Sequence, residues 1–185
     1  VYVGDITTKG NEDNTITAGP DGNATAGNDI IIGDKGGVQS QFTAGKNYNI
    51  ALIVDTSGSM KDPSGTAGKT RMALTIDALK NFVDSIKDHD GIVNVTLVDF
   101  NTNASRTKTI YGLTSANAQQ LIDAIGTTRN DGLKATGGTN YEAAFDQAIS
   151  WFNSTQISGQ SGEFENLTYF LTDGKPTYYV KDDGS

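Results

Sequence analysis

The chain has 185 residues, which is enough for one domain with a hydrophobic core and an additional segment. Its formal net charge of −8 argues against a nucleic-acid partner, because the phosphate backbone repels an acidic protein. The sequence contains no cysteine, so disulfides and thiolate metal sites are excluded. No apolar stretch is long enough to span a bilayer, and we expect no membrane insertion.

The composition changes near Lys46. Residues 1–46 are rich in Gly, Asp, Asn and Thr, and their short apolar patches lie between turn residues. This pattern predicts brief strands within 14–19 and 28–37, separated by irregular structure. We therefore expect a Gly/Asn-rich extension over residues 1–46 and a folded domain over residues 47–185.

Strand patterns alternate with helix patterns in this second region. Strands are predicted for the mainly apolar runs at 48–55, 91–100, 108–113 and 166–173. Apolar residues at three- and four-residue spacing predict helices over 69–88, 115–126 and 140–152. Alternating strands and helices indicate an α/β fold, with a doubly wound, mostly parallel sheet covered by helices on both faces.

Each predicted helix has one apolar face. The face of the first helix consists of Met72, Ile76, Leu79, Val83 and Ile86. That of the second consists of Ala118, Leu121, Ile122 and Ile125, and that of the third of Tyr141, Ala144, Phe145, Ala148, Ile149 and Phe152. Trp151 is expected in the core, and His89, the only histidine, at the surface near the end of the first helix.

Three loops carry the oxygen-rich side chains that could bind a metal. They read "DTSGSM", "GGTNYEAAF" and "TDGKP", and they contain Asp55, Ser57, Ser59, Thr139 and Asp173. Turn chemistry alone could explain the first loop, since Asp, Ser and Gly are common turn residues. However, the carboxyl ends of parallel strands meet at one edge of a sheet, so the three loops can converge there. Two carboxylates and three hydroxyls suit a hard dication such as Mg²⁺, and no His or Cys in these loops favours zinc or copper.

Together the three loops resemble the metal-ion-dependent adhesion site of the von Willebrand factor type A domain family. That site combines D-x-S-x-S with a distant Thr and a distant Asp followed by Gly, and the resemblance covers residues 47–185. It implies that Ser57, Ser59 and Thr139 provide hydroxyl ligands, and that Asp55 and Asp173 provide carboxylates, directly or through water. The ion would be Mg²⁺, Ca²⁺ or Mn²⁺, and a carboxylate of a protein or matrix partner would complete its coordination.

The resemblance also implies a sheet of six strands in the order 3-2-1-4-5-6. Four of these strands can be placed in this sequence, so we expect the domain to be truncated at its C-terminal end. The missing part of the domain, or another copy of the chain, would then pair with the strand at 166–173, because an open edge exposes unpaired backbone groups.

Two further patterns near the first loop are weaker. "SMKD" resembles a run that holds an adjacent calcium in integrin β subunits; Asp62 matches that run, but Pro63 replaces its second carboxylate. "GTAGKT" at 65–70 resembles the end of a phosphate-binding loop but lacks the first glycine, and the start of a helix explains it better.

The N-terminal extension contains "AGNDIIIGDKGG", in which Gly27, Asp29 and Ile31 partly resemble the calcium-binding repeat of RTX proteins. A linker or hairpin is the alternative explanation. A Cys-free, acidic flank rich in Gly, Asp, Asn and Thr next to a type A domain resembles a large bacterial RTX adhesin, and the extension would then be a candidate for Ca²⁺ binding. The chain would then be extracellular, at the bacterial surface, and type I secretion would fit the missing N-terminal leader.

The leading functional hypothesis is therefore a metal-dependent adhesion module. An intracellular subunit that uses the same site for complex assembly is the first alternative, and an architectural domain between repeats is another. No nucleophile and base pair is visible in the sequence, so we do not expect an enzyme.

Overall fold

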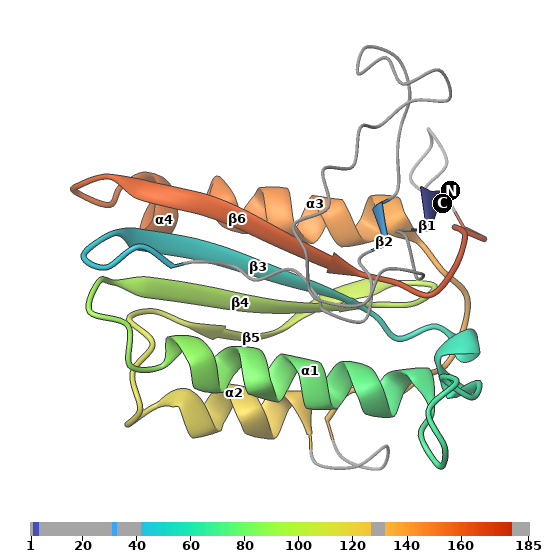
Figure 1. Ribbon diagram of the computed structural model, residues 1–185. Helices are drawn as coiled ribbons and strands as arrows, with labels where there is room; N and C mark the ends of the chain where they lie inside the picture. The colour runs from blue at the N-terminus through green and yellow to red at the C-terminus, as the bar shows by residue number, and fades with distance from the viewer. Residues whose placement is uncertain (1, 4–30, 33–41, 127–131, 179–185) are drawn as a thin grey trace, which may run out of the picture. The chain divides into compact units, whose positions relative to one another are not determined.

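The computed structural model describes residues 2–3, 31–32, 42–126 and 132–178 (Figure 1). The chain divides into two units, Val1–Gln41 and Phe42–Ser185. In the first unit, strands β1 (Tyr2–Val3) and β2 (Ile31–Ile32) form a short parallel pair. β2 lies within the predicted strand region 28–37, whereas the predicted strand at 14–19, and both Gly27 and Asp29, lie outside the described residues.

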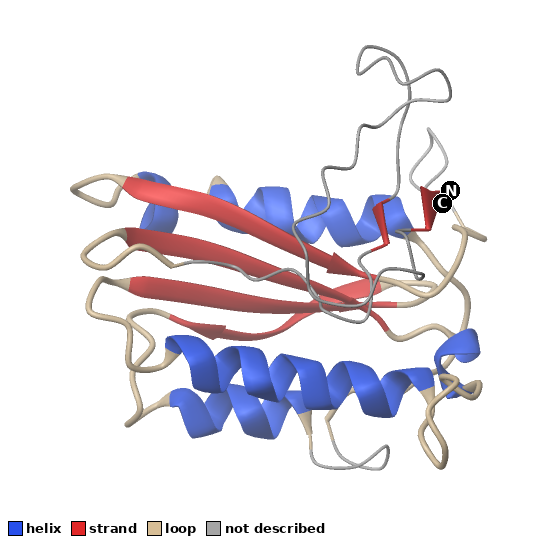
Figure 2. Ribbon diagram, in the orientation of Figure 1, coloured by secondary structure: helices blue, strands red, loops and turns tan. Residues whose placement is uncertain are grey.

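The second unit contains a four-stranded sheet in the order β5-β4-β3-β6 (Figure 2). The strands are β3 (Asn47–Asp55), β4 (Val93–Phe100), β5 (Ala104–Ile110) and β6 (Phe164–Leu171). β3 is parallel to both of its neighbours, and only β5 is antiparallel, which confirms the predicted mostly parallel α/β fold. β5 begins earlier than predicted, because an edge strand can pair through polar residues that leave one side exposed to water.

Helices cover both faces of this sheet. α1 (Arg71–Ile86) and α2 (Ala118–Ile125) lie side by side on one face, and α3 (Tyr141–Phe152) lies on the other with the short α4 (Thr155–Ser158) (Figure 1). A 3-10 turn, η1 (Gly58–Lys61), follows β3. Among the helices that the structure describes, none combines the length and apolar character that a membrane span requires.

β3 is one of the two inner strands, and its side chains alternate between two hydrophobic clusters. Tyr48, Ile50, Leu52 and Val54 pack with α1 and α2, whose predicted apolar residues are mostly buried. Residues on the opposite face of β3 pack with α3 and α4; this second cluster consists of Ala51, Ile53, Val98, Phe100, Ala144, Ala148, Trp151 and Ile157. Burial on both faces explains why the strand sequence is continuously apolar.

The face of α3 differs from the prediction. Ala144, Ala148 and Trp151 are buried, but Phe145 and Ile149 are 41% and 55% exposed. Small alanines allow the helix to approach the sheet closely, while Phe145 lies beside it and stacks on Phe170 of β6 at a centroid distance of 5.0 Å. The apolar residues of α3 thus extend beyond the face that is buried against the sheet. Their spacing alone did not show which of them lie at the centre of that face.

The surface position predicted for His89 is wrong. Its side chain is only 8% exposed, and its ring packs edge-on against Phe42 and Tyr48. Its Nε2 lies 2.8 Å from the carbonyl oxygen of Lys46. Charged neighbours in the sequence suggested a surface residue, but the connection from α1 to β4 folds this side chain back onto the start of β3.

Three asparagines, Asn49, Asn94 and Asn166, form a row across β4, β3 and β6. Asn94 donates to Asn49 (2.8 Å), and Asn49 donates to Asn166 (2.9 Å). The three residues are direct partners in the strand register. A shift of one residue would separate these amides and expose the apolar side chains, so the row helps to fix the register.

Candidate metal site

The first loop of the candidate site begins at the last residue of β3. Asp55 is fully buried, and its Oδ1 accepts a hydrogen bond from the backbone N–H of Ser57 (2.7 Å). Its Oδ2 accepts another from the hydroxyl of Thr172 (2.7 Å). The intervening Thr56 donates its hydroxyl proton to the carbonyl oxygen of Phe100. Thr56 thus points away from the candidate site, and the side chains of residues 55, 57 and 59 form this part of it.

Two serines connect Asp55 to Asp173. The hydroxyls of Ser57 and Ser59 lie 3.1 Å apart, and Ser59 donates to Oδ1 of Asp173 (2.9 Å). Asp173 lies two residues beyond the end of β6, which is the strand parallel to β3. The parallel pairing therefore brings together side chains that are far apart in the sequence, at one edge of the sheet.

The loop of Thr139 is attached to the first loop through the backbone. Gly58 donates its N–H to the carbonyl oxygen of Gly137 (2.9 Å), and Thr136 donates to that of Thr56 (2.6 Å). Gly137 has a φ of +71°, and a Cβ on Gly138 would lie 2.1 Å from the ring of Tyr178. The positive φ favours glycine at 137, and a side chain at 138 would require Tyr178 to move.

Thr139 itself is 5% exposed, and its backbone N–H donates to the hydroxyl of Thr177 (2.8 Å). Its own hydroxyl forms no hydrogen bond with the other described residues. The structure thus brings Asp55, Ser57, Ser59 and Asp173 into one hydrogen-bonded group, and Thr139 is not linked to this group by a hydrogen bond of its side chain.

Two residues that the sequence analysis did not identify support this group. The hydroxyl of Tyr141, the first residue of α3, lies 3.1 Å from that of Thr172 and bonds to the carbonyl oxygen of Gly174. Thr172 in turn donates to Asp55. Two features of the sequence could have indicated these supporting roles. Thr172 directly precedes Asp173, and Tyr141 has a hydroxyl on an otherwise apolar helix face.

A third unpredicted residue, Arg71, carries a positive charge into the site. Its Nη1 donates to Oδ2 of Asp173 at 2.6 Å and lies 3.8 Å from Oδ2 of Asp62. The hydrogen bond with Asp173 raises the already high pKa of Arg71. Asp62 therefore faces a guanidinium group, which argues against an adjacent calcium ion at this position.

The chemistry of these residues fits a hard dication. The described residues contain no group of three or more His, Cys, Asp or Glu side chains placed to hold a metal, so hydroxyl oxygens would have to complete any such site. Within the same part of the chain, no Lys or Arg pairs with the buried carboxylate of Asp55. A buried charge without a counter-charge is costly, and a bound cation would neutralise it.

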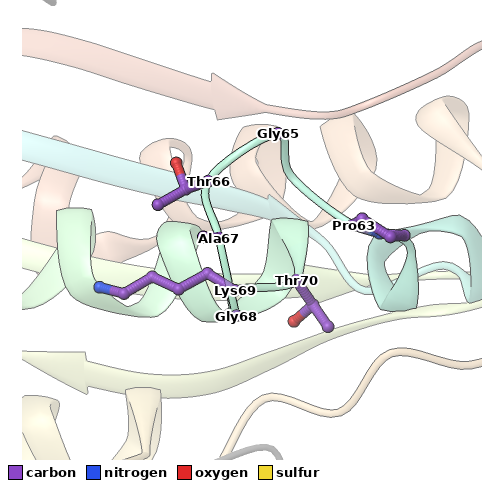
Figure 3. Close-up of a pocket in the computed structure, with 7 residues that line it drawn as sticks. All are labelled: Pro63, Gly65, Thr66, Ala67, Gly68, Lys69 and Thr70. Atoms are coloured by element: carbon purple, nitrogen blue, oxygen red, sulfur yellow. The ribbon is translucent and has the colours of Figure 1, made fainter.

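Residues 63–70 form a hairpin between η1 and α1 and line a pocket (Figure 3). The hairpin ends at Thr70, whose hydroxyl caps α1 by accepting from the N–H of Ala73 (3.2 Å). Lys69 extends away from Pro63 in Figure 3, and its ammonium group contacts Asp77. "GTAGKT" therefore starts a helix, as predicted, and its lysine does not point into a phosphate-binding loop.

Comparisons with known proteins agree with this fold. The PilB minor pilin from Streptococcus sanguinis superposes with a TM-score of 0.54 and 21% identity, over 73% of this chain. The pilus adhesin SpaC from Lactobacillus rhamnosus GG gives 0.53 and 25% over 71%, and the vWF domain of the type V pili tip protein Mfa5 from Porphyromonas gingivalis gives 0.52 and 19% over 76%. The chain spans only 31%, 16% and 43% of these three structures. No curated protein matches the chain significantly.

The model of one sequence family, the von Willebrand factor type A domain, matches residues 50–175. This match covers more than half of the chain and includes β3 from Ile50 onwards, all of β4, β5 and β6, and all five predicted site residues. The chain therefore belongs to the von Willebrand factor type A domain family.

Proposed function

We propose that residues 47–185 form a metal-dependent ligand-binding module of a bacterial surface adhesin. The observation that carries this proposal is the buried carboxylate of Asp55, which lies next to clustered hydroxyls and has no basic partner in the described chain. Mg²⁺ is the proposed ion, with Ca²⁺ or Mn²⁺ as substitutes, because every candidate ligand is an oxygen atom.

The proposed ligands have separate roles. Asp55 and Asp173 would balance the charge of the ion, directly or through water, while the hydroxyls of Ser57, Ser59 and Thr139 would act as neutral ligands. When bound, the ion would attract an anionic group from outside the chain. Neutral hydroxyls leave a dication electron-poor, so a carboxylate of a protein or matrix partner would bind it more strongly than at a carboxylate-rich site.

The folded chain holds these ligands in place before a partner arrives. The N–H of Ser57 and the hydroxyl of Thr172 fix both oxygens of Asp55, and Tyr141 fixes the loop that contains Thr172. Such preorganisation lowers the entropic cost of binding. The proposed role is binding and not catalysis, since the only histidine, His89, packs at the opposite end of β3.

The proposed location is the bacterial surface. It is supported by the pilus proteins that share the fold, one of which is a pilus adhesin with 25% identity. The finer proposal of an RTX adhesin exported by type I secretion rests on the composition of residues 1–46, as does possible Ca²⁺ binding by that extension.

Calorimetry with Mg²⁺ tests the site directly. Asp55→Ala should abolish measurable binding, because it removes a charge and a ligand at the centre of the group. Asp77→Asn is a matched control: it also removes one carboxylate, but one that pairs with Lys69 on the exposed side of α1. Equal binding by the wild type and Asp55→Ala would rule out the assignment. Partner binding would then be screened on host and matrix surfaces with and without EDTA.

A further inference from the structure

Arg71 is the first residue of α1, and its side chain enters the candidate metal site. Its guanidinium donates to Asp173 at 2.6 Å, where the carboxylate is only 10% exposed. A cation at the N-terminus of a helix is unfavourable, because the helix dipole is positive there. Pairing with the largely buried carboxylate of Asp173 offsets this unfavourable position of the Arg71 charge.

This contact occupies the carboxylate oxygen of Asp173 that does not bond to Ser59. Oδ1 accepts from Ser59, and Oδ2 accepts from Arg71. A dication that binds Asp173 therefore meets a carboxylate whose charge is already neutralised, with a second cation beside it. The bound dication and the guanidinium of Arg71 would repel each other when both bind the same carboxylate. This repulsion is stronger in a partly buried site than in water.

A second acceptor lies within reach of the same guanidinium group. Oδ2 of Asp62 is 3.8 Å from Nη1 of Arg71, and the Asp62 side chain is 60% exposed. The backbone N–H of Arg71 also donates to the carbonyl oxygen of Asp62 (3.0 Å), which keeps the two residues together. The side chain can thus transfer from Asp173 to Asp62 without a movement of α1.

We propose that Arg71 is an internal counter-cation, which holds Asp173 in the metal-free site and moves to Asp62 when a dication binds. This inference rests on the proposed metal site. It means that the site stays ordered without metal, and that Arg71 lowers the affinity for the ion. The affinity is then set by a residue outside the D-x-S-x-S, Thr and Asp-Gly motifs.

The test compares Arg71→Gln with Lys69→Gln by calorimetry with Mg²⁺ on the full chain. Both variants lose one positive charge, but Lys69 pairs with Asp77 and not with Asp173. Arg71→Gln should bind Mg²⁺ about tenfold more tightly than the wild type, and Lys69→Gln should change the affinity by less than about twofold. Unchanged or weaker binding by Arg71→Gln would overturn the inference.

Two further measurements test the inference, and the second does not depend on the folding of Arg71→Gln. In EDTA, Arg71→Gln should melt at a lower temperature than the wild type, and excess Mg²⁺ should remove this difference, because the ion takes over the charge compensation. Asp62→Asn should weaken Mg²⁺ binding more than Asp77→Asn, since Arg71 then lacks its second acceptor. Equal effects of these two carboxylate variants would contradict the transfer.

The outcomes also separate this inference from the proposed function. If the wild type binds Mg²⁺ and Arg71→Gln binds no more tightly, only the inference fails. If neither protein binds any of Mg²⁺, Ca²⁺ or Mn²⁺, both fail. Binding by Arg71→Gln but not by the wild type would support the role of Arg71 and contradict metal binding by the natural chain.

Discussion

The two ends of β3 both bury polar side chains, but they satisfy them differently. At the amino end, Asn49 bonds to Asn94 and Asn166, so neutral amides satisfy one another across three strands. At the carboxyl end, Asp55 receives two hydrogen bonds but no positive charge from the described chain. The first arrangement is complete by itself, whereas the second retains a charge that a ligand can neutralise. Within one strand, this difference separates a structural polar group from a binding site.

The largest expected effect comes from introducing a charge at the amino end. Asn49→Asp would bury a carboxylate against the side-chain oxygen of Asn166, and its described hydrogen-bond partners are amides that carry no balancing charge. We expect the free energy of unfolding, measured in urea, to fall by about 3 kcal/mol or more. Asn103→Asp, at an exposed loop residue, should change it by less than about 0.5 kcal/mol. A similar small change in both variants would show that the asparagine row tolerates charge.

Removing the charge of Asp55, at the carboxyl end of β3, should not destabilise the metal-free protein but should abolish its stabilisation by Mg²⁺. Asp55→Asn keeps the shape of the side chain, its amide oxygen can accept from the N–H of Ser57, and the rotatable hydroxyl of Thr172 can accept from its NH₂ group. The protein should therefore be at least as stable as the wild type in EDTA. At a Mg²⁺ concentration of 100 times the dissociation constant, the wild type should gain about 2.7 kcal/mol and the variant nothing. Thermal melting with and without Mg²⁺ measures both quantities. Loss of stability of Asp55→Asn in EDTA would contradict an uncompensated charge.

The supporting hydroxyl should have a smaller effect. Thr172→Val removes the donor to Oδ2 of Asp55 with little change in volume, and should destabilise the metal-free protein by about 1–2 kcal/mol. Thr168→Val, at an exposed position of β6, the strand that precedes Thr172, is the control and should be nearly neutral. If urea titrations give equal stabilities for the two variants, Thr172 does not support Asp55.

The smallest effect is expected for an exposed ion pair at the amino end. The hydrogen bond to Glu165 raises the pKa of Lys46 above its ordinary value of 10.5. Because folding raises this pKa, the stabilisation is complete below pH 10.5 and disappears as the pH rises through the folded-state pKa. Lys46→Gln should therefore melt slightly below the wild type at pH 7, with the difference vanishing at high pH. A difference that grows with pH would contradict this sign.

Short-range patterns predicted much of this fold and most of the candidate site. The spacing of Met72, Ile76, Leu79, Val83 and Ile86 identified the buried face of α1, and all five residues are buried. The motif positions of Asp55, Ser57, Ser59 and Asp173 predicted residues that the structure brings together. Metal binding by these residues stays a prediction.

Contacts between distant segments were not predictable in the same way. Arg71 and Asp173 are 102 residues apart, and a single arginine at the start of a helix gives no periodic signal. Thr172 and Asp55 are 117 residues apart and meet only because β6 pairs with β3. His89 and Phe145 were misplaced because local polarity and helical spacing do not show which segments pack against them.

The parallel pairing of β3 with β6 also has a mechanical consequence. The two strands are in register from Asn47↔Phe164 to Val54↔Leu171. A pulling force applied at Asn47 and Leu171 would run along both strands, so their hydrogen bonds would resist it together in shear. The same force applied at Asn47 and Phe164 would open the bonds one after another from one end. Single-molecule pulling through these two pairs of attachment points should therefore give a higher rupture force for the first pair, and the first geometry loads the edge of the sheet that carries Asp55 and Asp173.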